Sequence, residues 1–151
     1  MVIPEFSRRR VLATGALGAV AALLPPTVPA MADEADDLAH RLMGPFVAKE
    51  GKVHLKIKEV AESGANEPVG VVVDSPMTPA DHVRAIHILA EGNPSPVVAS
   101  WYLTPRSGRA EVNFRMRLAK SQVVRAYAVT SDGSVWVARQ DVKVAIGGCG
   151  G

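Results

Sequence analysis

The sequence ends in five residues that combine one thiol with four glycines, and Cys149 is the only cysteine among 151 residues. The chain therefore cannot form an internal disulfide, which leaves a free thiol or a bond to another molecule. Glycine has no side chain to anchor in a core and places few limits on φ and ψ. Five such residues span up to roughly 17 Å when extended. Residues 147–151 are therefore predicted to be a slim, flexible arm that carries the sulfur of Cys149 away from its own domain.

The thiol itself is predicted to be unactivated. A free cysteine has a pKa near about 8.5, so only a small fraction is thiolate at neutral pH. The arm contains no histidine or lysine that would lower this pKa, and the terminal carboxylate two residues after Cys149 disfavours the thiolate. Activation is therefore expected to come from the protein that receives the arm.

The N-terminal residues resemble an export signal. Ser7-Arg8-Arg9-Arg10 is a twin-arginine start, and it is followed by a short apolar run and by a small-residue cleavage signal at residues 30–32. We expect a signal peptide over residues 1–32, a mature chain that begins at Asp33, and export to the periplasm by the twin-arginine pathway. The apolar run is too short for a membrane anchor. This pathway moves folded proteins and no cofactor motif follows, so a companion subunit is the simpler reason for its use.

Charge excludes one class of partner. Residues 1–32 hold three arginines and one glutamate of the 17 basic and 15 acidic residues, which leaves 14 of each in the mature chain. A mature chain near neutrality argues against binding to nucleic acid.

The mature chain is predicted to begin with a helical segment over residues 33–48. Four acidic residues favour the N-terminus of a helix over residues 33–47, and Leu38, Leu42 and Met43 form an apolar stripe. The pair Gly44-Pro45 is a stop signal for this helix.

After the helix, the hydrophobic period becomes two. Val53, Leu55 and Ile57 alternate with polar residues, and residues 69–73 form a continuous apolar run that we expect to be buried on both faces. Further strands are expected over 83–90, 97–103, 110–118, 123–130, 135–138 and 143–146. Seven or eight short strands in about 100 residues predict an all-β fold. It is expected to be an immunoglobulin-like antiparallel β-sandwich over residues 49–146, with a short N-terminal helix and the flexible C-terminal arm.

The remaining polar residues indicate neither a metal site nor a catalytic site. His40, His54, His82 and His87 lack the spacing of a zinc site, so we expect structural or surface roles and no metal. No acid and base pair and no nucleophile elbow is present, and no catalytic residue is predicted.

Two further groups leave alternatives open. Arg106 and Arg109 are expected in a solvated turn, with an anionic contact near the arm as the alternative.

Core packing is expected for the aromatic residues. The alternative is an exposed surface over residues 69–73 or 97–103 that binds a partner. These aromatic residues are Trp101, Tyr102, Phe114, Tyr127 and Trp136.

Several strings of residues together resemble one family, the SoxY sulfur-carrier subunits of the bacterial Sox thiosulfate-oxidising system. The match lies in residues 142–151, with the glycine-flanked Cys149, and in residues 73–78, 81–83, 108–110 and 131–133. The resemblance implies covalent attachment of sulfur to Cys149, with Gly147, Gly148, Gly150 and Gly151 as hinge residues of a swinging arm. It also implies that the chain carries no cofactor other than covalent sulfur adducts and has no turnover of its own.

The resemblance further implies a set of partners. These are SoxZ in a heterodimer, the cytochrome complex SoxAX, the hydrolase SoxB and the sulfane dehydrogenase SoxCD. Two other functions remain open: a structural sandwich that dimerises through a Cys149 disulfide, and a thiol sulfurtransferase that uses Cys149. Sulfur adducts on Cys149 would distinguish a carrier from a structural protein.

Overall fold

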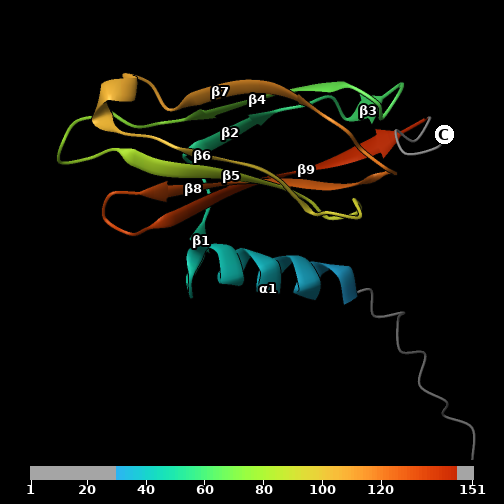
Figure 1. Cartoon of the computed structure of the whole chain (residues 1–151), viewed down its shortest axis with the longest axis horizontal. Coiled ribbons are helices and arrows are strands. Elements are labelled where there is room, and N and C mark those ends of the chain that lie inside the picture. Colours follow the sequence, from blue (N-terminus) through green and yellow to red (C-terminus); the bar gives the residue numbers. More distant parts are fainter. Residues whose placement is uncertain (1–29, 146–151) are drawn as a thin grey trace, which may run out of the picture.

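The computed structural model describes residues 30–145, and for residues 30–33 it describes the backbone. Most of the predicted signal peptide and the whole predicted arm, 147–151, therefore lie outside the described residues. Figure 1 shows two β-sheets packed face to face, with one helix against the outer face of the larger sheet. The predicted all-β, immunoglobulin-like sandwich is confirmed.

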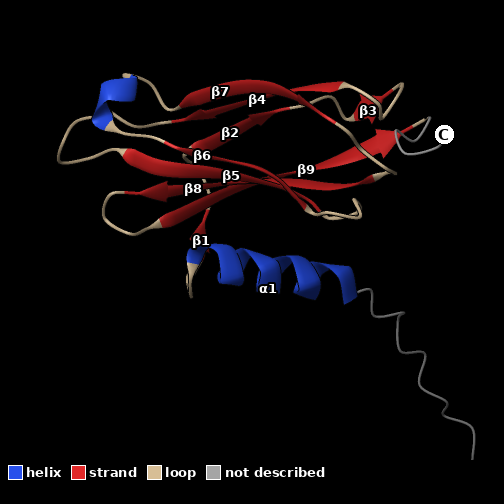
Figure 2. Ribbon diagram, in the orientation of Figure 1, coloured by secondary structure: helices blue, strands red, loops and turns tan. Residues whose placement is uncertain are grey.

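The larger sheet has six strands and the smaller has three (Figure 2). The larger runs in the order β1 (Ala48–Lys49), β9 (Val135–Val144), β8 (Gln122–Thr130), β5 (Val83–Ala90) and β6 (Val97–Tyr102), with β3 (Val60–Ala61) also paired to β9. The smaller runs β2 (Val53–Lys56), β4 (Glu67–Val73) and β7 (Glu111–Met116). Neighbouring strands are antiparallel, except that the two-residue strands β1 and β3 run parallel to β9.

The main core lies between the two sheets. Alternate residues of a strand point to opposite faces, so the period-two pattern over 110–118 places one set of side chains inside. Ala110, Met116 and Leu118 are buried, and Val112 and Phe114 pack against them. The central strands β5 and β8 contribute Ile86, Ile88 and Val124 to the same cluster, all fully buried.

The helix α1 (Ala30–Met43) forms a second, smaller core with the outer face of the larger sheet. Ala39 is buried there, and Leu38, Leu42 and Met43 pack around it, as the apolar stripe predicted. The helix begins and ends earlier than expected over 33–47: it includes residues 30–32 and ends at Met43. Gly44 ends it with a φ of 82°, and its N–H bonds to the carbonyl of His40. Among residues 30–145, no helix is long and apolar enough to cross a membrane.

Two strand predictions need correction. The run over 69–73 is not buried on both faces, because β4 lies in the smaller sheet, whose outer face is uncovered by any described element. Val69, Val71 and Val73 face the core, whereas Val72 is half-exposed. The two short strands expected at 135–138 and 143–146 are one continuous strand, β9, since the polar residues between them form an exposed part of the same strand.

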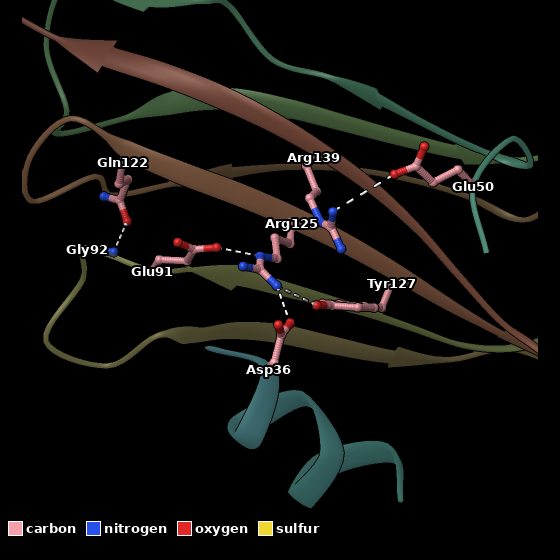
Figure 3. Close-up of polar contacts among 8 residues, drawn as sticks. All are labelled: Asp36, Glu50, Glu91, Gly92, Gln122, Arg125, Tyr127 and Arg139. Atoms are coloured by element: carbon pink, nitrogen blue, oxygen red, sulfur yellow. Dashed lines mark hydrogen bonds and ion pairs between the residues drawn. The ribbon is translucent and has the colours of Figure 1, made fainter. Parts of the chain in front are cut away.

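A buried arginine connects the helix to the larger sheet. Arg125 of β8 is 5% exposed, and its guanidinium donates to the carboxylates of Glu91 and Asp36 and to the Tyr127 hydroxyl at 3.2 Å (Figure 3). Asp36 belongs to α1, so this cluster fixes the helix as well as balancing a buried charge. Burial alone lowers the pKa of Arg125, but the hydrogen bond to Tyr127 and the two carboxylates raise it well above its usual value.

Candidate functional site: the base of the C-terminal arm

The last described residues are held on both sides. Val144 pairs with Ala61 of β3, and the N–H of Ala145 donates to the carbonyl of Ala61 at 3.0 Å. On the other side, the hydroxyl of Ser121 accepts from the N–H of Val144 at 2.9 Å. The chain is therefore fixed to the larger sheet up to Ala145, four residues before Cys149. Cys149 and the hinge glycines themselves lie outside the described residues.

We call the end of the sandwich at which β9 finishes the arm end (Figure 1). Strand pairing and backbone hydrogen bonds place Ala61, Gly64, Glu67, Leu118 and Val144 there. A hydrogen bond of 2.7 Å from the N–H of Leu118 to the carbonyl of Gly64 links the segments that follow β7 and β3. Ala61 and Leu118 are fully buried, and Val144 packs against their cluster. The described chain thus ends at a well-packed edge of the domain.

Glu67 is the residue of the arm end that sequence reasoning missed. It is the first residue of β4 and is only 5% exposed. Its Oε1 atom has no hydrogen-bond partner among residues 30–145. In the sequence, Glu67 belongs to a group of turn-forming residues. It lies two residues before Val69, however, and residues two apart in a strand point to the same face, which indicates a core-facing side chain.

The two arginines of the predicted turn lie at the opposite end of the sandwich. Arg106 is in the short 3-10 helix η1 (Pro105–Ser107), which Figure 1 shows far from the end of β9. The side chain of Arg109 is 83% exposed and forms a long ion pair of 3.8 Å with Glu111. The predicted solvated turn is confirmed, and the alternative of an anionic contact near the base of the arm is wrong.

The four histidines are separate in the structure, and residues 30–145 contain no group of three potential metal ligands. His40 packs edge-on against Phe46, and His54 pairs with Asp74 at 2.8 Å on the surface. His82 lies beside the β8–β9 turn, where its backbone N–H donates to the Ser131 hydroxyl. His87 is buried on the face of the larger sheet that α1 covers, and its Nδ1 atom lies 2.8 Å from the Ser100 hydroxyl.

His87 should make stability depend on pH. Burial lowers its pKa from the ordinary value of 6.5, so the unfolded chain binds a proton more readily than the folded chain. Stability is therefore expected to fall as pH decreases through about 6.5. Urea unfolding at pH 7.5 and pH 5.5 should show a smaller loss for His87→Gln, which does not titrate, than for the wild type. His54→Gln is the exposed control, and an equal loss in all three proteins would contradict the assignment to His87.

Most of the aromatic residues pack in the interior, as expected. Trp101 and Phe114 are 4.8 Å apart between their ring centres, and Tyr127 is fully buried. Tyr102 is the exception, since 78% of it is exposed. It pairs in register with Ala85 of β5, which faces α1, so Tyr102 lies on the outer face of the larger sheet, edge-on to His87 at 6.1 Å between ring centres. A partner surface over residues 97–103 stays a prediction.

The fold and the site define a class: an immunoglobulin-like β-sandwich whose last strand leads into a C-terminal segment with a lone cysteine. The family model for the sulfur oxidation protein SoxY matches residues 39–149, a range that includes Cys149. The chain belongs to the SoxY family, which confirms the resemblance read from the sequence.

Solved structures agree with this membership. The sulfur carrier protein SoxY from Chlorobium limicola f thiosulfatophilum is 33% identical, with a TM-score of 0.65 over 76% of this chain and 99% of that chain. A superoxide reductase (neelaredoxin) from Ignicoccus hospitalis is 24% identical, with a TM-score of 0.55 over 62% of this chain and 80% of its own. A putative superoxide reductase from Thermotoga maritima is 17% identical, with a TM-score of 0.55 over 64% and 93%. The last two similarities show the fold alone. No curated protein matches this chain.

Proposed function

We propose that this chain is a periplasmic sulfur carrier that holds thiosulfate-derived intermediates covalently on Cys149 and presents them to partner Sox enzymes. The observation that carries the proposal is that the SoxY family match extends through Cys149, the only cysteine of the chain. The Chlorobium relative is itself described as a sulfur carrier. The hydrogen bonds around Val144 and Ala145 support a role in which the domain is a rigid base for the arm.

The chemistry on Cys149 begins with an oxidative conjugation. The thiol and thiosulfate form a new S–S bond and release one proton and two electrons, which a c-type cytochrome partner such as SoxAX accepts. Water then cleaves the terminal sulfone as sulfate in the hydrolase SoxB and leaves a persulfide on Cys149. The sulfane dehydrogenase SoxCD oxidises this remaining sulfur to a sulfone with oxygen from water, and a cytochrome acceptor takes the electrons. Each step is done by a partner, so the chain has no turnover and no cofactor of its own, other than the covalent sulfur adducts.

The same proposal assigns a heterodimer with SoxZ and export of the folded pair by the twin-arginine pathway. A slim arm suits this set of partners, because glycines on both sides of Cys149 let the backbone enter a narrow channel and turn within it. The thiol is unactivated in the free protein, which protects it until an enzyme receives the arm.

Intact-protein mass spectrometry tests the proposal. The chain is incubated with thiosulfate, SoxZ and the cognate SoxAX cytochrome, and its mass is measured before and after addition of reductant. The expected result is a reductant-labile addition of thiosulfate or sulfur atoms on Cys149. A thiol that stays unmodified, or that only forms the Cys149 disulfide dimer, would favour the structural alternative. Sulfur transfer by the isolated chain, without an oxidising partner, would favour the sulfurtransferase.

A further inference from the structure

The outer face of the smaller sheet, which no described element covers, has an open groove at its centre. The groove has a volume of about 590 Å³, and its lining includes Lys56, Gly70, Asn113 and Arg115. Position 70 points outward in the central strand β4 and lies between Lys56 of β2 and Asn113 of β7. A Cβ atom there would lie 2.9 Å from the Oδ1 atom of Asn113. The absence of a side chain at Gly70 therefore keeps the floor of the groove open.

The groove is basic. Lys56 and Arg115 flank β4 on its two sides, and two strand spacings, or roughly 10 Å, separate the strands that carry them. Both side chains are exposed, and neither forms an ion pair within residues 30–145. The acidic residues Asp74 and Glu111 lie at the other end of this sheet, where each pairs with a different basic residue. Lys56 and Arg115 thus present two positive charges that nothing in the described domain balances.

The groove lies beside the arm end. The Nη1 atom of Arg115 donates to the carbonyl of Asn66 at 3.3 Å, and Asn66 directly precedes Glu67, the first residue of β4. Lys56 is the last residue of β2 and pairs with Gly70. A protein that binds over this groove therefore also lies next to the end of the sandwich at which β9 finishes.

The build of the groove favours a protein segment over a small oxyanion. Gly70 lies in the central strand, so the ladders with β2 and β7 use its backbone N–H and carbonyl. An oxyanion would find only side-chain donors, in a groove much larger than a sulfate ion. The exposed Pro68 adds apolar surface to the lining. Apolar surface beside an arginine is typical of contacts between proteins.

We propose that this groove binds an acidic segment on the enzymes that receive the arm. Carboxylates of that segment pair with Lys56 and with the guanidinium of Arg115, which can hold a carboxylate through two hydrogen bonds. Charges of this kind raise the rate of encounter and fix the orientation of the complex. The identity of the occupant rests on the proposed function, whereas the basic groove itself does not.

A peptide tests the groove without any Sox enzyme. Fluorescein-labelled hexaglutamate is titrated with the reduced full chain, alone and in complex with SoxZ, and fluorescence anisotropy reports binding. The double variant Lys56→Gln and Arg115→Gln removes both cations, and Gly70→Val fills the groove without a change of charge. The matched control is the double variant Arg106→Gln and Arg109→Gln, which removes two positive charges at the opposite end of the sandwich. Both groove variants should bind the peptide about fivefold more weakly than the wild type, the factor expected for two exposed ion pairs, and the control should bind it equally well.

Adduct formation tests the occupant. The conjugation of thiosulfate to Cys149 by SoxAX is measured with the carrier as the varied substrate. Its kcat/KM should fall about fivefold in both groove variants and stay within about twofold in the control. Added salt should lower kcat/KM more steeply for the wild type than for the variant without Lys56 and Arg115, because salt screens the charges that attract the enzyme.

Four results would overturn the proposal. Equal peptide affinities in the groove variants and the control show that the groove is not the site, and a groove that binds sulfate but not the peptide, as seen in the amide resonance of Gly70, is a small-oxyanion site. Loss of peptide binding on addition of SoxZ assigns this face to the heterodimer. Peptide binding with an unchanged kcat/KM excludes the enzyme as the occupant. If Gly70→Val does not fold, the double glutamine variant decides alone. Failure of the proposed function is seen separately, since the wild type then forms no adduct on Cys149 at all.

Discussion

Replacing Cys149 by serine is expected to abolish every thiosulfate-dependent reaction of the reconstituted Sox enzymes. A serine hydroxyl cannot form the S–S bond with thiosulfate, so no intermediate is attached and the later enzymes have no substrate. The chain has no second cysteine that could replace the lost thiol. The measurement is the reduction of cytochrome c by thiosulfate with SoxAX, SoxB, SoxCD and SoxZ present.

The stability of the variant is the control for this experiment. The last described hydrogen bond is donated by Ala145, four residues before Cys149, so Cys149→Ser should unfold within about 0.5 kcal/mol of the wild type. Cytochrome reduction that persists with the folded serine variant would show that the sulfur is carried elsewhere.

Replacing Arg125 by alanine is expected to destabilise the domain by about 3 to 5 kcal/mol, which is typical when one partner of a buried ion pair is removed. The loss is large because the side chain of Glu91 is only 10% exposed and would remain as an unpaired buried carboxylate. The ion pair that links β8 to α1 is lost at the same time, since Asp36 bonds to the same guanidinium, whereas the apolar contact of Tyr127 and Val129 with the helix remains. Urea unfolding monitored by circular dichroism measures the change.

The matched control for Arg125→Ala is another arginine of the larger sheet. Arg139 of β9 forms a 3.9 Å pair with Glu50, and the two side chains are 49% and 78% exposed (Figure 3). Exposed pairs contribute little, so Arg139→Ala should cost less than about 1 kcal/mol. Equal costs for the two variants would show that the buried cluster does not hold the helix to the sheet.

Local patterns were sufficient for the class of fold and for most strands. The residues around Val112 and Phe114 alternate because side chains of a strand point to opposite faces in turn and a sandwich buries one face of each sheet. The burial of β4 and the length of β9 could not be predicted in this way. A run of valines looks the same whether one face or both are covered, and the polar middle of β9 resembles a turn although it belongs to an exposed part of a long strand.

The buried charges could not be predicted, because their partners are distant in the sequence. Arg125 bonds to residues 34 and 89 positions away, so nothing near it in the sequence indicates a pair. β8 is covered by the core on one face and by α1 on the other, and strands of this kind show no alternation that would mark an arginine as buried. Glu67 was missed for a related reason, since a glutamate before a proline suggests a surface turn. The candidate site in the sequence was therefore the arm alone.

The position of β9 also bears on how the domain resists force. Its hydrogen bonds to β8 run along its length, and those to β1 and β3 hold its two ends. These bonds lie across the strand direction. In the proposed function an enzyme draws on the segment that follows β9, and tension along β9 would be shared by many bonds that must shear together, instead of opening one at a time. This pairing of β9 therefore suits the proposed carrier role, in which a partner pulls on the end of the strand without peeling it from the sheet.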